Sequence, residues 1–131
     1  MKKSTSIVLS TFLLAAIAYR LVASNGSASL TQGSSPNVQL NAGAQHIQID
    51  VQNTAYSPST TIAAANLPST LTLSRQNTYG CTRTTLTHAL QFNQLLSETG
   101  ETTVDLGTHQ AGEEIEGVCG MGMYHFKIKF L

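Results

Sequence analysis

From His46 to the last residues, apolar and polar side chains alternate with a period of two, which is typical of half-buried β-strands. The alternation is clear at residues 47–51 and clearest at residues 124–130. Tyr56-Ser57-Pro58 predicts a turn, Leu67-Pro68 and Gly100 predict breaks, and residues 90–96 predict a connecting turn. Further strands are expected near residues 60–62, 71–73, 84–92, 102–106 and 112–119.

About six to eight short strands at regular spacing favour an all-β sandwich. The composition agrees, because only 11% of the 131 residues are charged and Trp is absent. The expected domain runs over 46–131, and a chain of that length buries only a modest core.

The N-terminus carries a membrane signal. Lys2 and Lys3 precede the apolar stretch 7–18, and Tyr19 and Arg20 interrupt it before residue 23. Segment 1–23 is therefore either a cleaved signal peptide or an uncleaved anchor helix. An anchor places the domain on the extracytoplasmic side of the cell membrane, and cleavage makes it secreted or periplasmic.

Between this signal and the expected domain lies a small, polar, aperiodic segment, 24–45, which predicts a flexible tether. From residue 46 onward, four basic residues face seven acidic ones, so the domain is weakly acidic. No basic patch indicates a nucleic-acid partner. We find no catalytic motif and expect neither an enzyme nor a small-molecule substrate.

One short motif carries distinctive chemistry. Cys119-Gly120-Met121-Gly122-Met123 places one thiol and two thioethers within five residues in a loop between two expected strands. Sulfur-only ligand sets of Cys and Met select Cu(I). If the loop around Cys81 lies at the same end of the sandwich, two thiolates and two thioethers could hold one or two Cu(I) ions.

Other interpretations stay open for the same residues. Two cysteines in an extracytoplasmic protein usually form a disulfide, and methionines near strands usually fill a core. An electron-transfer cupredoxin is the second alternative, but a blue-copper site needs two histidines and the loop has none. We expect His46 and His109 on the surface, His125 solvated or on the opposite face, and His88 on a strand.

The segments Tyr56-Ser57-Pro58, Leu71-Thr72-Leu73, Gly80-Cys81-Thr82 and 117–123 together resemble the cupredoxin-like domain family. More narrowly, they resemble the membrane-anchored cupredoxin-fold Cu(I) chaperones of Gram-positive copper-resistance systems. The resemblance covers about residues 46–131, and the anchor and tether match in layout.

This resemblance implies a Greek-key β-sandwich with a cuprous site built from Cys81, Cys119, Met121 and Met123. It further implies two Cu(I) ions, the tighter one held by the cysteines and the weaker one by the methionines with a shared thiolate. The implied partner is a copper-exporting P-type ATPase, which would receive Cu(I) from the domain.

Overall fold

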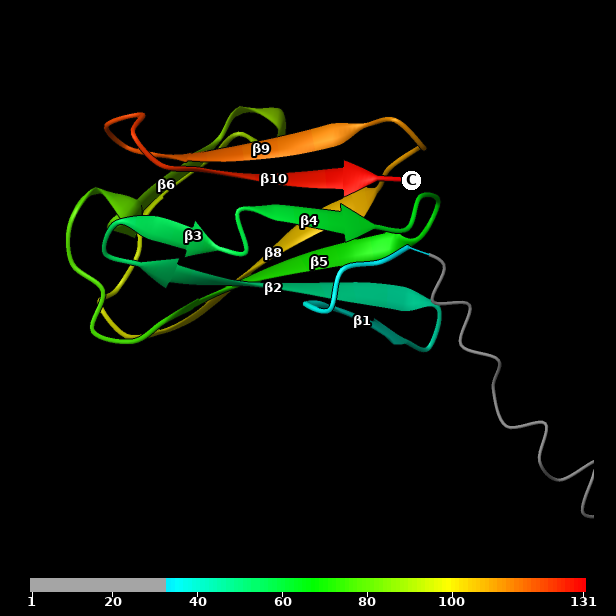
Figure 1. The fold of residues 1–131 in the computed structure, drawn as a ribbon, viewed down its shortest axis with the longest axis horizontal. Helices are drawn as coiled ribbons and strands as arrows, with labels where there is room; N and C mark the ends of the chain where they lie inside the picture. Colours follow the sequence, from blue (N-terminus) through cyan, green and yellow to red (C-terminus); the bar gives the residue numbers. More distant parts are fainter. Residues whose placement is uncertain (1–32) are drawn as a thin grey trace, which may run out of the picture. The chain divides into compact units, whose positions relative to one another are not determined.

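This computed structural model describes residues 33–131. These residues fold into two five-stranded β-sheets (Figure 1). The expected signal segment 1–23 and the first part of the tether, 24–32, lie outside the described residues. No helix within 33–131 is long and apolar enough to cross a membrane.

The first sheet has the strand order β1-β2-β5-β8, with β3 paired to β2. Strands β2 and β5 run parallel, and the other pairs in this sheet are antiparallel. The strands span β1 Val38–Asn41, β2 Ala44–Gln52, β3 Ala55–Ser57, β5 Pro68–Arg75 and β8 Gly100–Thr108.

The second sheet has the order β4-β10-β9-β6-β7. Its β4–β10 pair is parallel, and the remaining pairs are antiparallel. Its strands are β4 Thr60–Ala63, β6 Thr84–Thr87, β7 Phe92–Leu95, β9 Glu114–Cys119 and β10 His125–Phe130, and the short 3₁₀ helices η1 Cys81–Arg83 and η2 His88–Leu90 flank β6.

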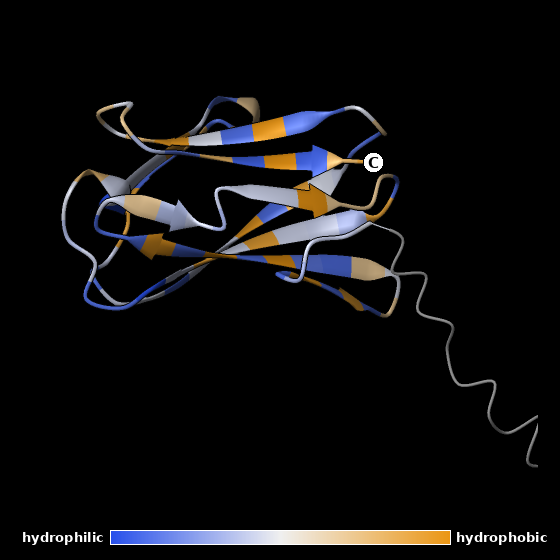
Figure 2. Cartoon of the chain, in the orientation of Figure 1, coloured by the Kyte–Doolittle hydropathy of each residue, from blue (hydrophilic) through white to orange (hydrophobic). Residues whose placement is uncertain are grey.

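The core lies between the two sheets. Alternate residues of each strand point inward, as the orange and blue bands along β2 and β10 show (Figure 2). Ile47 and Ile49 on β2 and Phe126 and Ile128 on β10 are completely buried. The all-β sandwich expected from the period-two pattern is therefore confirmed.

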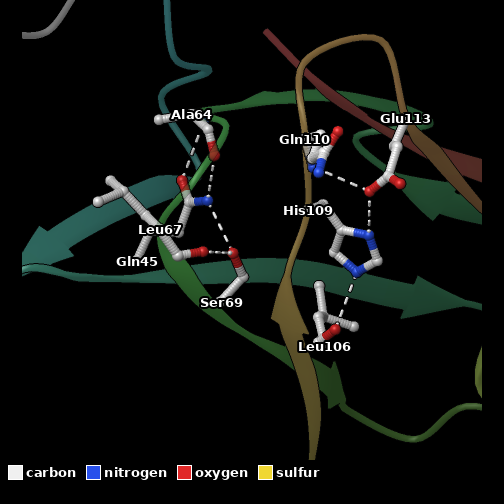
Figure 3. Close-up of polar contacts among 8 residues, drawn as sticks. All are labelled: Gln45, Ala64, Leu67, Ser69, Leu106, His109, Gln110 and Glu113. Carbon is white, nitrogen blue, oxygen red and sulfur yellow. Dashed lines mark hydrogen bonds and ion pairs between the residues drawn. The ribbon is translucent and has the colours of Figure 1, made fainter.

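Polar side chains close the sandwich at the end where β2 begins and β8 and β10 finish (Figure 3). The buried Gln45 amide donates to Ala64 O and Ser69 Oγ, both at 2.7 Å, and its Oε1 accepts from Ala64 N at 3.0 Å. On the other side, the His109 ring bridges Glu113 Oε2 at 2.9 Å and Leu106 O at 2.8 Å. These contacts satisfy backbone groups where the strands end.

Several local predictions were wrong. Tyr56 is not in a turn but is buried in β3, and residues 92–95 form β7 rather than a turn. The breaks expected at Leu67-Pro68 and Gly100 do fall between strands, and Pro68 and Gly100 are the first residues of the strands that follow. The domain also starts earlier than position 46, because β1 and the first residues of β2 occupy part of the expected tether. Two contacts hold this region in the domain: β1 pairs with β2, and the buried Gln45 amide is bonded to Ala64 and Ser69.

Candidate metal centre

The β9–β10 hairpin shapes the candidate sulfur loop. Cys119 is the last residue of β9, and its N–H donates to Tyr124 O at 2.9 Å. The chain then turns back, with Gly122 N–H donating to Cys119 O at 2.8 Å. Gly122 has φ +72°, a left-handed conformation that glycine adopts without strain. The loop therefore folds tightly against the thiol that precedes it.

Cys81 is placed by the segment that joins β5 to β6. It opens η1 directly after Gly80, whose φ of 98° is again left-handed. Thr82 Oγ1 donates to Gln52 O at 2.6 Å, and Tyr79 N donates to Asn53 Oδ1 at 2.6 Å. These two bonds fasten the Cys81 segment to the end of β2 in the opposite sheet.

The two cysteines meet at this end of the sandwich. Their sulfurs lie 2.9 Å apart, although the residues are separated by 38 positions in the sequence. Both are free thiols; Cys119 is completely buried and Cys81 is half-buried. The structure thus brings together the two thiols that the sequence could only place in separate loops.

The surroundings of Cys119 favour its thiolate. Burial is the largest single influence and opposes ionisation, but hydrogen bonds from the Cys81 thiol and the backbone amides of Tyr124, Met121 and Met123 outweigh it. Together they lower the pKa of Cys119 to about 7. The pKa of Cys81 is raised, first because its thiol donates to Cys119 and then because of burial. The pair therefore loses its first proton from Cys119 and retains the proton on Cys81.

Buried hydroxyl groups form hydrogen bonds next to the two cysteines. Tyr56 Oη lies 3.1 Å from Thr85 Oγ1 and 3.4 Å from Thr82 O, while Thr85 pairs with Cys119 across the β6–β9 ladder. The Tyr56 ring also packs edge-on against Phe126, with centroids 5.1 Å apart. Tyr56 thereby links η1, β6 and β10.

Sequence reasoning missed this supporting role. The sequence predicts a turn at Tyr56, and it gives Thr82 and Thr85 no supporting role because threonine is common in strands. The buried hydroxyls acquire meaning only when the two sheets face each other. A sequence signal for them is weak at best, since nothing local distinguishes these threonines from the many others.

Met121 and Met123 lie in the loop after Cys119 and are strongly exposed, at 72% and 59%. Their backbone amides face the Cys119 sulfur, but their side chains extend into solvent. Tyr79, next to the Cys81 segment, is also 52% exposed. The two segments that carry the cysteines therefore also carry three large exposed apolar side chains, which we call the apolar rim.

The family model described as "Cupredoxin-like domain" matches residues 12–130. The chain belongs to the cupredoxin-like domain family. No curated protein matches it significantly.

Two solved structures share the cupredoxin-like fold. One is a copper binding protein determined in its apo form by NMR, with 23% identity and a TM-score of 0.63 over 72% of this chain and 94% of that one. The other is the metal binding domain of the Streptococcus pneumoniae D39 Cu(I)-exporting P-type ATPase CopA with Cu(I), with 20% identity and a TM-score of 0.63 over 72% and 92% of the two chains. At these identities the similarity establishes the fold.

The histidines of this cupredoxin-like domain have other neighbours. His46 lies on β2 with Nδ1 2.6 Å from Thr70 Oγ1, and His109 is held at the opposite end of the sandwich. His125 is half-exposed beside Glu116. His88 opens η2 rather than lying on a strand, which corrects the sequence-based expectation.

Proposed function

We propose that this cupredoxin-like domain is an extracytoplasmic Cu(I) chaperone that binds the ion through Cys81 and Cys119, assisted by Met121 and Met123. The observation that carries the proposal is the 2.9 Å approach of two free thiols beside a loop with two exposed thioethers. Four soft sulfur donors suit Cu(I) better than any divalent ion of biological abundance.

The thiol pair fits a metal cargo after a small adjustment. Two metal–thiolate bonds of about 2.3 Å that meet at a trigonal angle span roughly 4 Å between sulfurs. The present 2.9 Å separation must therefore widen by about 1 Å. The half-buried Cys81 side chain is the one that can reorient, whereas the Cys119 side chain is buried and its backbone is fixed in the β9–β10 ladder. Loss of the Cys81 proton accompanies binding.

The exposed methionines suit an entry and exit step. A neutral thioether binds more weakly than a thiolate, so Met121 and Met123 would hold a second, more exchangeable ion or pass the ion to and from the cysteines. The proposed recipient is a copper-exporting P-type ATPase. Two observations support this recipient: a domain of one such ATPase has the same fold, and the apolar rim is an exposed surface that suits docking of another protein.

We further propose that segment 1–23 anchors the protein in the cell membrane and that the following residues allow the domain to reach a membrane pump. Confinement to the membrane raises the effective concentration of the domain near such a partner. This layout would favour transfer by direct contact over release of the ion into solution.

The second candidate, a disulfide-stabilised sandwich without metal, has one observation in its favour. Free thiols only 2.9 Å apart are well placed for oxidation. The two functions differ in behaviour: a chaperone keeps the cysteines reduced in the presence of Cu(I), whereas a structural disulfide persists with copper and mild reductant. An electron-transfer cupredoxin would instead show an intense thiolate-to-Cu(II) band.

Anaerobic titration with Cu(I), in competition with a chromogenic Cu(I) chelator, tests the proposal. We expect two ions in the wild-type protein, loss of tight binding in Cys81→Ser and in Cys119→Ser, and one remaining tight ion when Met121 and Met123 are both replaced by Leu. Because Leu has nearly the volume of Met and both positions are exposed, folding should be unaffected.

His46→Gln is the matched control, since His46 lies on the other sheet and should leave both stoichiometry and affinity unchanged. Full Cu(I) affinity in either Cys→Ser variant would refute the cysteine site. An unchanged stoichiometry in the double methionine variant would refute the second ion alone.

A further inference from the structure

A second group of metal-binding side chains lies on the outer face of the β4-β10-β9-β6-β7 sheet. A surface hollow of about 410 Å³ is lined by His88, Ala89, Glu114, Glu116, Val118 and His125. Two imidazoles and two carboxylates thus surround one concave surface that contains no sulfur.

Strand register explains why these residues share one face. Val118 pairs with Leu86 on β6 and with His125 on β10, so the two neighbouring strands present their side chains around it. Glu116 lies two residues earlier on β9 and therefore on the same outer face. His88 follows β6 by one residue and approaches from the other side of β9.

The outer face is separate from the sulfur centre. Val118 and Cys119 are adjacent in β9, but successive side chains of a strand point to opposite faces. Cys119 is buried toward the core, whereas His125 and Glu116 have half-exposed side chains. A ligand in this hollow would therefore not contact the cysteines.

We propose that this hollow is a site for a borderline divalent transition-metal ion, with His88, Glu116 and His125 as ligands. Imidazole and carboxylate are ligands of Zn(II) and Cu(II), whereas thiolate and thioether sulfur select Cu(I). His125 Nδ1 already lies 3.4 Å from Glu116 Oε1, so two of the three ligands are neighbours. Glu114 is engaged by Lys129 at 3.3 Å and serves only as an outer carboxylate.

The third ligand has to rotate inward. Among residues 33–131 no three such donors are already gathered around one point. His88 is exposed and starts a short 3₁₀ turn, so its ring is free to change rotamer toward Glu116 without disturbing the core. Binding would then join η2, β9 and β10 across the outer face.

Zn(II) titration of the full-length chain, followed by NMR of the histidine rings, tests this site. The sulfur centre is removed first with the double variant Cys81→Ser and Cys119→Ser, because thiolates also bind Zn(II). We expect saturable shifts of the His88 and His125 rings with unchanged His46 and His109. His88→Gln, Glu116→Gln and His125→Gln should each weaken binding at least tenfold.

If the double serine variant does not fold, the same titration is made on wild-type protein whose thiols are saturated with Cu(I) under anaerobic conditions. His46→Gln is the control and should bind Zn(II) as the parent does. Equal shifts of all four rings, or unaltered affinity in His88→Gln and His125→Gln, would overturn the proposal.

Discussion

The hydrogen bond between the two thiols leads to a quantitative prediction about ionisation. The pKa of Cys119 is about 7, and the Cys81 thiol is the first of the hydrogen-bond donors that lower it. Replacing Cys81 by Ala removes this donor while the burial of Cys119, which opposes ionisation, remains. The pKa of Cys119 should therefore rise.

The size of the effect can be estimated. With a pKa of about 7, Cys119 is about half ionised at pH 7. A rise of one unit, equivalent to about 1.4 kcal/mol, lowers the thiolate fraction at pH 7 to about one tenth. The backbone amides of Met121, Met123 and Tyr124 still face the sulfur, so the pKa should remain below that of an apolar buried thiol.

Ultraviolet absorbance of the thiolate during an anaerobic pH titration measures this change in the metal-free protein. Wild-type protein should show one ionisation near pH 7 and a second one well above it. Cys81→Ala should show a single ionisation shifted upward by about one unit or more. The matched variant, Cys119→Ala, should lose the ionisation near pH 7 altogether. An ionisation that stays near pH 7 in Cys81→Ala would refute the role of the thiol–thiol hydrogen bond.

Two further predictions concern Tyr56 and the Phe126 ring that packs against it. Burial raises the pKa of Tyr56 to about 12 from the usual 10. The contribution of the neutral Tyr56 side chain to the free energy of unfolding is therefore fully present below pH 10 and is lost as the pH rises through 12. Urea denaturation measures the drop in the free energy of unfolding between pH 10 and pH 12. This drop should be smaller in Tyr56→Phe than in wild type by about 2 to 3 kcal/mol. Exposed Tyr79→Phe should behave like wild type, and equal pH dependence of Tyr56→Phe would contradict the account. Gly117→Ala should lower the free energy of unfolding by about 1–3 kcal/mol in the same assay. The reason is that a Cβ at this position would lie 2.1 Å from the Phe126 ring. Unchanged stability would show that the ring moves aside freely.

The strands with the strictest alternation of buried and exposed side chains were the easiest to predict, and two exposed edge strands were missed. The alternating segments at 47–51 and 124–130 predict strands because one face of each is buried and the other is more exposed. The edge strands β1 and β7 were missed, since nearly all their side chains are exposed and leave no period-two signal. These strands are defined by backbone pairing to β2 and β6, which the residue pattern does not record.

The candidate site likewise combines features that the sequence determines with features that only the fold determines. Chain order alone determined that one cysteine and two methionines share a tight glycine-containing loop, and the chemistry of sulfur made copper the natural hypothesis. Only the tertiary structure decided that Cys81 meets Cys119 at 2.9 Å. The reason is physical: the Cys81 segment is held by two bonds of Thr82, whose hydroxyl donates to Gln52 O at the end of β2 and whose carbonyl oxygen accepts from the Tyr56 hydroxyl of β3.

Local sequence therefore specified the donors and the turn that presents three of them. Packing of the two sheets set the distance between the thiols and, through the buried hydrogen bonds at Cys119, which sulfur ionises first. Side-chain type and short-range geometry are encoded within a few residues. The Cys81 and Cys119 sulfurs, 38 positions apart in the sequence, come close only when the two sheets pack around the buried core and hold the segments at its end in place.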